Sequence, residues 1–265
     1  MCGRYALTAD KDALALEFEV DATTDVQLPP RWNIAPTSHI YIVRERQEGG
    51  QRVRELVVAR WGLIPAWAKE ESIGARLANA RAETVAEKPA FRGSFAKRRC
   101  LVLCDGWYEW LPAQPARAGV RQPKQPYLMT VTGRQHVAFA GLYEWWREPG
   151  TPADAPALLT ANLITTDAVG VAAQVHDRMP VLLDHHAWQA WLNPQGGADA
   201  PAVLSRAISD LPEQPVAIRP VTTDVNSVRN DGAYLWGEFF PPTLDPSAVA
   251  EAEISDQDSQ DQTLF

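Results

Sequence analysis

The second residue of the chain is a cysteine, which directly follows the initiator methionine in the opening "MCGRY". If Met1 is removed, Cys2 carries a free α-amino group and a thiol on adjacent carbon atoms, which makes it a 1,2-aminothiol. An α-amino group has a pKa of about 8, so part of it is unprotonated and nucleophilic at neutral pH. The neighbouring Arg4 should favour the thiolate form. The alternative is that Cys2 is an accidental small residue behind Met1.

A glutamate within an aromatic stretch is a candidate for proton transfer. Glu109 lies in "GWYEW", beside Trp107, Tyr108 and Trp110. A carboxyl group packed among aromatic rings should have a raised pKa, because burial disfavours its charged form, and such a group suits acid–base catalysis. The pattern recurs at Glu144 in "GLYEWW". Glu109 could also be an edge-strand carboxylate that faces water, so the pattern alone leaves both interpretations open.

Two further polar residues could complete a site. His176 in "VHDRMP" precedes Asp177, and a histidine beside a carboxylate can act as an oriented acid or base. Asn79 in "LANARAET" precedes residues 81–88, which we predict to form a short helix. Its amide could cap that helix or orient a reacting hydroxyl or carbonyl group. His176 could likewise be a capping or core residue.

The remaining cysteines do not indicate a metal site. Cys100 and Cys104 lie four residues apart on an apolar strand, where we expect buried core thiols. A zinc site needs about four ligands with suitable spacing. The pair His185 and His186 is far away in the sequence, and no second pair of cysteines exists. We therefore expect neither a metal nor a cofactor.

The elements that must position these residues are mostly strands. Alternating apolar residues predict a hairpin over 39–63 and a second one over 126–146, each with glycine at its turn. Residues 8–18 are typical of a short helix capped by Thr8. We predict an α+β fold, with one domain over residues 1–243. It is built on a curved, largely antiparallel, barrel-like sheet with short peripheral helices.

The net charge of −8 is unevenly distributed. Residues 244–265 contain six acidic residues, no basic residue and no apolar periodicity, so we expect a disordered acidic tail. Residues 44–99 contain 13 basic and seven acidic residues, and they include Trp67 in the loop-like "GLIPAWAKEES". Exposed aromatic residues among basic ones are typical of surfaces that stack single-stranded bases. The charge therefore permits an anionic partner, although a charged run can also be a solvated face.

Composition also limits the location. No apolar run approaches the roughly 20 residues of a membrane span, and the N-terminus lacks the pattern of a signal peptide. Three cysteines in a chain of 265 residues argue against a disulfide framework and for a reducing compartment. We expect a cytoplasmic protein with no membrane partner, associated with the nucleoid if its partner is DNA. The absence of a coiled-coil pattern favours a monomer.

Seven motifs occur in an order and spacing typical of one family. They are "MCGRY", "WNIAPT", "RWGLIPAW", "NARAET", "CDGWYEW", "AGLYEWW" and "VHDRMPVLL". Over residues 1–237 the chain resembles the SOS response-associated peptidase (SRAP) family. The resemblance implies a protein that senses abasic sites in single-stranded DNA and crosslinks to them through a thiazolidine ring formed by the N-terminal cysteine. It implies a catalytic group of Cys2, Asn79, Glu109 and His176.

The resemblance also implies a DNA-contacting surface. Its residues would be Arg4, Asn33, Pro36, Trp67 and Arg81. The chain departs from some members of the family at Ala68, where they carry a second aromatic residue after the tryptophan. Lyase activity on the DNA strand and self-cleavage behind Met1 would be related thiol-dependent activities.

Other classes of protein share part of the pattern. Class II glutamine amidotransferases also begin with Met-Cys-Gly and use the freed cysteine to attack an amide. Their synthetase or isomerase half would need a much longer chain. A cysteine peptidase is a further alternative, although only Met1 precedes Cys2. A DNA-binding module with an inert Cys2 is the alternative without catalysis. Glutaminase activity or adduct formation with an aldehyde would discriminate among these.

Overall fold

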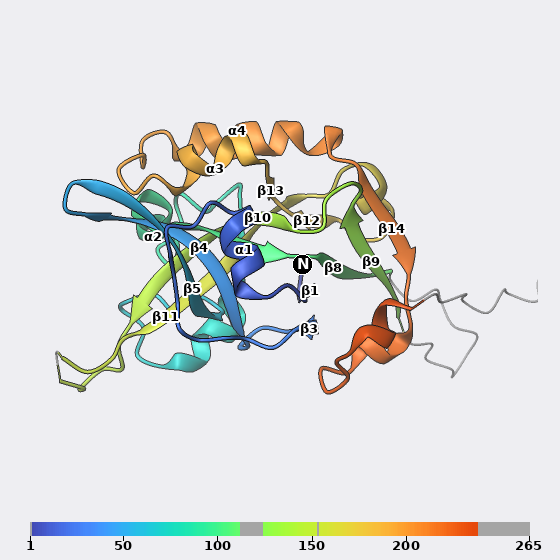
Figure 1. Cartoon of the computed structure of the whole chain (residues 1–265), viewed down its shortest axis with the longest axis horizontal. Helices are drawn as coiled ribbons and strands as arrows, with labels where there is room; N and C mark the ends of the chain where they lie inside the picture. Colours follow the sequence, from blue (N-terminus) through green and yellow to red (C-terminus); the bar gives the residue numbers. More distant parts are fainter. Residues whose placement is uncertain (1, 112–123, 153, 238–265) are drawn as a thin grey trace, which may run out of the picture.

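The computed structural model describes residues 2–111, 124–152 and 154–237, and it shows two sheets with a few short helices at the periphery (Figure 1). This confirms the predicted α+β class. The predicted disordered tail over 244–265 lies outside the described residues.

The smaller sheet carries the start of the chain. It has five strands in the order β14-β9-β8-β1-β3, and every neighbouring pair is antiparallel. Its strands are β1 (Arg4–Leu7), β3 (Arg31–Ile34), β8 (Gly106–Leu111), β9 (Gln125–Val131) and β14 (Val216–Pro220).

The larger sheet curves back on itself. Its main path is β12-β11-β10-β7-β4-β5-β2, with β13 on β10 and β6 on β11. A parallel pairing of β11 with β5 joins the ring β11-β10-β7-β4-β5, so the sheet is partly barrel-like. Its strands are β2 (Ala22–Thr23), β4 (His39–Glu48), β5 (Gln51–Trp61), β6 (Asn79–Arg81), β7 (Arg99–Cys104), β10 (Val137–Trp146), β11 (Leu158–Asp167), β12 (Arg178–Pro180) and β13 (Leu182–Leu183).

The helices are short, and α3 and α4 lie together along one edge of the molecule (Figure 1). The α-helices are α1 (Lys11–Glu17), α2 (Arg92–Lys97), α3 (His185–Leu192) and α4 (Ala200–Asp210). The 3₁₀ turns are η1 (Glu71–Leu77), η2 (Gly170–Gln174), η3 (Leu211–Glu213), η4 (Thr223–Asn226) and η5 (Ala233–Trp236). Among the described residues, no helix has the length and apolar character needed to cross a membrane.

One predicted hairpin is confirmed and the other is wrong. Strands β4 and β5 pair antiparallel along their whole length across a turn at Gly49 and Gly50, both with positive φ. Strands β9 and β10 also exist, with a turn at Gly133 between them, but they belong to different sheets. Strand β9 pairs with β8 and β14, whereas β10 pairs with β7, β11 and β13. The chain thus changes sheets at this turn.

Two helix predictions also need correction. The side chain of Asp10, not Thr8, caps α1 by accepting hydrogen bonds from the first turn. The backbone N–H and hydroxyl groups of Thr8 both donate to Asp105 at 2.7 Å, so Thr8 is bound elsewhere. The helix predicted over 81–88 is absent and a series of turns replaces it. The N–H of Ala82 donates to the carbonyl of Thr165, so pairing with β11 overrides the local helix preference.

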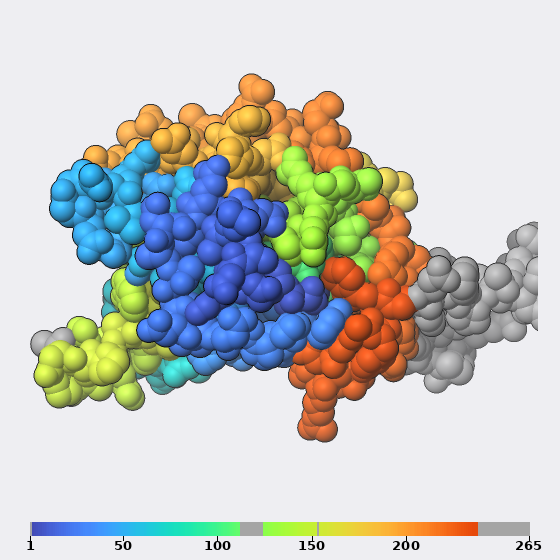
Figure 2. Space-filling view, viewed as in Figure 1, coloured from blue at the N-terminus to red at the C-terminus, as the bar shows by residue number. Residues whose placement is uncertain are grey.

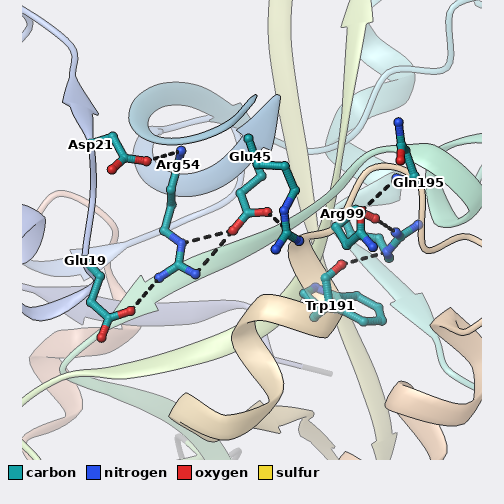
Figure 3. Close-up of polar contacts among 9 residues, drawn as sticks. Glu19, Asp21, Glu45, Arg54, Arg99, Trp191 and Gln195 are labelled. Carbon is teal, nitrogen blue, oxygen red and sulfur yellow. Dashed lines mark hydrogen bonds and ion pairs between the residues drawn. The ribbon is translucent and has the colours of Figure 1, made fainter. Parts of the chain in front are cut away.

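Several arginines of the basic segment form ion pairs within the fold. Figure 3 shows Arg54 bridging Glu45 and Glu19, while its backbone N–H donates to Asp21. The fully buried Arg99 bonds to backbone carbonyls instead of a carboxylate. It donates to the carbonyl of Trp191 at 2.7 Å and to two further carbonyls (Figure 3). The basic composition of residues 44–99 therefore overstates the positive charge that is available to a partner.

Candidate active site

Cys2 lies just before β1 and is completely buried in the main hydrophobic core. Asn79, on β6, donates from its amide nitrogen to the backbone carbonyl of Cys2 at 2.8 Å. Asn79 thus begins a strand and not the expected helix. Its amide oxygen is buried and has no hydrogen-bond partner among the described residues. The contact fixes the N-terminal residue by its main chain, and it leaves an acceptor in the interior of the site.

Glu109 approaches Cys2 from the neighbouring strand β8. Successive strand side chains alternate between faces, so Glu109 shares the main-core face with Trp107. Tyr108 and Trp110 belong to a separate cluster on the other face. The Glu109 side chain is only 2% exposed, and this burial raises its pKa to about 7, as the aromatic sequence predicted. A carboxyl group with this pKa can accept and release a proton near neutrality.

The thiol of Cys2 is held in its protonated form. Burial raises its pKa well above the usual value, and the negative charge of Glu109 raises it further. This corrects the expectation that Arg4 promotes the thiolate. The Arg4 guanidinium instead donates to Asn33 and to the carbonyl of Val225, at 2.9 Å each. Any nucleophilic sulfur must therefore be generated during a reaction, and it is not present at rest.

His176 is the third group that converges on this site. Its Nε2 lies 3.9 Å from a carboxylate oxygen of Glu109, a distance just beyond a direct hydrogen bond. On the other side of the ring, Nδ1 accepts the backbone N–H of Arg178 at 2.9 Å. An oxygen of Asp177 lies 2.9 Å from the same Nδ1. Partial burial lowers the pKa of His176, and the charge of Asp177 acts against that shift.

Asn33 lies in the interior, not at the surface. It is fully buried, and its amide nitrogen donates to three backbone carbonyls of a single loop, those of Val225, Ser227 and Asn230. In Figure 2 the orange-red C-terminal segment that contains this loop forms a lobe against the blue N-terminal part. Asn33 thus joins β3 to residues 225–230, and any effect of Asn33 on DNA would pass through this loop.

The other expected DNA contacts are more accessible. Trp67 is 62% exposed. The residue after it, Ala68, is buried, and its carbonyl accepts the indole N–H of Trp146 at 2.9 Å, which holds the Trp67 loop against β10. Pro36 is half-buried and Arg81 is exposed. Arg4 anchors the loop at Val225, whereas Trp67 and Arg81 are exposed and accessible to a partner.

Two features of the site were not identified from the sequence. The segment "VTTDVNSVRNDG", rich in Asn, Asp, Ser and Thr, supplies the loop carbonyls that hold Arg4 and Asn33. The second is an ion pair between Glu83 and Arg178, which belong to two motifs of the seven. The described residues contain no group of three or more His, Cys, Asp and Glu side chains that could hold a metal ion.

Comparisons with known proteins show the family of the chain. The family model described as SOS response associated peptidase (SRAP) matches residues 1–228. The chain is 35% identical over 237 residues to the abasic site processing protein YoqW of Bacillus subtilis, covering 89% of this chain and 98% of that protein. It is 30% identical over 271 residues to the abasic site processing protein HMCES of Gallus gallus, covering 87% and 76%.

A solved structure is similar in fold. The crystal structure of a protein from Bacteroides thetaiotaomicron superposes with a TM-score of 0.70 at 23% identity, covering 90% of this chain and 100% of that one. At this level of identity the likeness concerns the fold alone.

Proposed function

The chain belongs to the SRAP family, and from this membership and the geometry around Cys2 we propose that it processes abasic sites in DNA. The names of the relatives YoqW and HMCES support the substrate class. The finer proposal is that the protein binds an abasic site in single-stranded DNA as a monomer and forms a covalent crosslink. The observation that carries it is the convergence of Asn79, Glu109 and His176 on a cysteine at position 2.

The proposed reaction starts after removal of Met1, because the nitrogen of Cys2 is otherwise part of a peptide bond. An abasic deoxyribose opens to an aldehyde, and the α-amine attacks its C1′ to form an imine with loss of one water molecule. The thiol then adds across the C=N bond: its sulfur bonds to the imine carbon, its proton ends on the nitrogen, and a five-membered thiazolidine ring closes. Amine, thiol and aldehyde are held together, which replaces a bimolecular encounter by an intramolecular one and contributes several kcal/mol, about 7 in well-oriented cases.

Each neighbouring side chain has a place in this scheme. His176 donates a hydrogen bond from Nε2–H to the ring oxygen and stabilises the negative charge that develops there as the sugar opens. Glu109, with its pKa raised by burial to about 7, moves protons between the amine, the departing water and the solvent. Asn79 holds the carbonyl of Cys2, and so it orients both reacting groups on that residue.

We assign the DNA contacts to two groups of residues. Trp67 and Arg81 are exposed and can meet the strand directly, by stacking on a base and by pairing with a phosphate. Pro36 is half-buried and follows β3, the strand that carries Asn33. Arg4 and Asn33 act on DNA through the loop 225–230 that they hold. Because a charged side chain would contact a phosphate, we expect the affinity of this surface for DNA to fall as the salt concentration rises.

The direct test is the intact mass of the purified protein after it is mixed with a single-stranded oligonucleotide that contains one abasic site. The expected product has the mass of protein without Met1 plus the DNA, less one water. Cys2→Ala keeps an α-amine and can still form a transient imine, so it is the matched control and should give no heat-stable adduct. Glutaminase activity on free glutamine without any adduct would instead support the amidotransferase alternative.

A further inference from the structure

A bidentate ion pair connects the two segments that carry Asn79 and His176. The guanidinium of Arg178 donates through Nη1 to Glu83 Oε1 at 3.0 Å and through Nη2 to Glu83 Oε2 at 2.9 Å. Glu83 follows β6, which begins at Asn79, and Arg178 begins β12, two residues after His176. The pair therefore spans the gap between two parts of the site that lie almost 100 residues apart in the sequence.

The same guanidinium also grips the strand that lies between these segments. Arg178 donates to the carbonyl of Thr165 at 2.7 Å and to the carboxylate of Asp167 at 2.5 Å, and both residues are on β11. Strand β11 pairs with β6 on one side and with β12 on the other. One side chain thus clamps the ends of three strands. Burial alone would raise the pKa of Glu83, but the hydrogen bonds and charge of Arg178, together with hydrogen bonds from the backbone and Thr166, lower it.

The backbone of Arg178 has a separate contact with the imidazole. Its N–H donates to Nδ1 of His176, so in the neutral ring Nδ1 is an acceptor and the proton sits on Nε2. Nε2 is the nitrogen that faces Glu109. Asp177 can compete for Nδ1 only when Nδ1 itself carries a proton, and its side chain is 86% exposed to water. The orientation of the Arg178 peptide therefore decides which nitrogen faces the site.

We propose that Glu83 and Arg178 form a positioning pair for His176: by fixing the Arg178 main chain, the pair keeps the neutral imidazole protonated on Nε2 and aimed at Glu109. The side chain of Arg178 is only 10% exposed, so its geometry is set by its partners and not by water. A partly buried ion pair of this kind contributes little net stability but can specify one arrangement. The kinetic consequence rests on the proposed function, whereas the tautomer is a property of the free protein.

The first arm of the test measures the tautomer by long-range ¹H–¹⁵N NMR of the imidazole, with the His176 signals assigned by their loss in His176→Ala. The wild-type protein should show Nε2–H at a pH where the ring is neutral. Glu83→Ala should show a mixture of tautomers. Because Glu83 is 45% exposed, water can fill its place and the variant should fold. Glu87→Ala is the matched control, since it removes an exposed carboxylate from the same turn.

The second arm measures the rate of adduct formation at saturating DNA on two substrates. On the natural abasic sugar, Glu83→Ala should be slower by about 10-fold or more, by analogy with the loss of a residue that orients a metal-bound histidine. On a simple aldehyde without a ring to open, the rate should stay within about twofold, because His176 serves ring opening. In a His176→Ala background, Glu83→Ala should cause no further slowing.

Several results would overturn the positioning role. They are an unchanged tautomer in Glu83→Ala, equal slowing on both substrates, and equal slowing by Glu87→Ala. If Glu83→Ala does not fold, the same measurements on Arg178→Lys decide, because lysine keeps the charge but loses the fork that holds Glu83. A wild-type protein that forms no adduct with either substrate would refute the proposed function, while the NMR arm would still decide the tautomer.

Discussion

Replacing Glu109 with glutamine should stabilise the protein at alkaline pH and leave its stability nearly unchanged in acid. The pKa of Glu109 is raised by burial from 4.5 to about 7. Between these values the folded protein binds a proton that the unfolded chain has released, so the free energy of unfolding falls as pH rises through this window. Each pH unit is worth 1.36 kcal/mol, so the loss is about 3 kcal/mol above pH 7. Glutamine has the same shape and no charge to bury.

The assay is chemical denaturation of the wild type and Glu109→Gln at about pH 4.5 and at about pH 8.5. The variant should gain up to about 3 kcal/mol relative to the wild type between the first pH and the second. Other titrating groups are common to both proteins and cancel in the comparison. Glu144→Gln is the control, because Glu144 occupies the equivalent place in "GLYEWW" but is paired with Arg98 and Ser94. Its removal breaks those contacts and should give no gain at pH 8.5.

Equal stability differences at the two pH values would refute the reasoning. They would mean that Glu109 titrates at its ordinary pKa and is in contact with water. The same variant tests catalysis, since glutamine cannot carry a proton. Adduct formation should slow by about 100-fold or more, within the range for loss of a general acid–base group.

Other predictions follow from the same contacts. A tag that keeps the nitrogen of Cys2 in a peptide bond should abolish the adduct in denaturing gels. Trp67→Ala should weaken binding to single-stranded DNA by about 1–3 kcal/mol in fluorescence titrations, if a base stacks on the exposed ring. Asn33→Ala leaves loop carbonyls unpaired and should destabilise the fold by about 1–3 kcal/mol in thermal melts. Deletion of residues 244–265 should leave the affinity for DNA unchanged or make it tighter at low salt. The reason is that an acidic tail would compete with DNA for the basic side chains of the protein.

Local patterns predicted the elements that depend on local chemistry. The hairpin of β4 and β5 was predictable because alternating side chains and a Gly-Gly turn act within one short segment. Cys2, Glu109 and His176 were chosen as candidates by residue type, and the structure brings them close together. The raised pKa of Glu109 was also predicted, but its cause is burial on the core face, whereas Tyr108 and Trp110 lie on the other face. The fold class was predictable from the excess of strands.

Contacts between distant segments explain what the sequence did not reveal. The turns after β6 replace a helix because Ala82 pairs with Thr165 and Glu83 binds Arg178, and both partners come much later in the chain. Arg4 and Asn33 each carry a side chain suited to a phosphate, but a loop around residues 225–230 occupies both. The number of basic residues in the sequence cannot show that arginines form ion pairs with glutamates across the hairpin of β4 and β5.

The electrostatics of the site favour one order of steps in the proposed reaction. Burial and the charge of Glu109 both oppose a thiolate at Cys2, so sulfur is a poor first nucleophile. An imine formed on the α-nitrogen becomes positively charged when it is protonated, and this charge lies next to the sulfur in the ring that will close. A positive charge lowers the pKa of a nearby thiol, just as the negative charge of Glu109 raises it. In the proposed reaction the amine therefore attacks first, and its own product would then activate the sulfur, while Asn79 would hold the residue by its carbonyl through both steps.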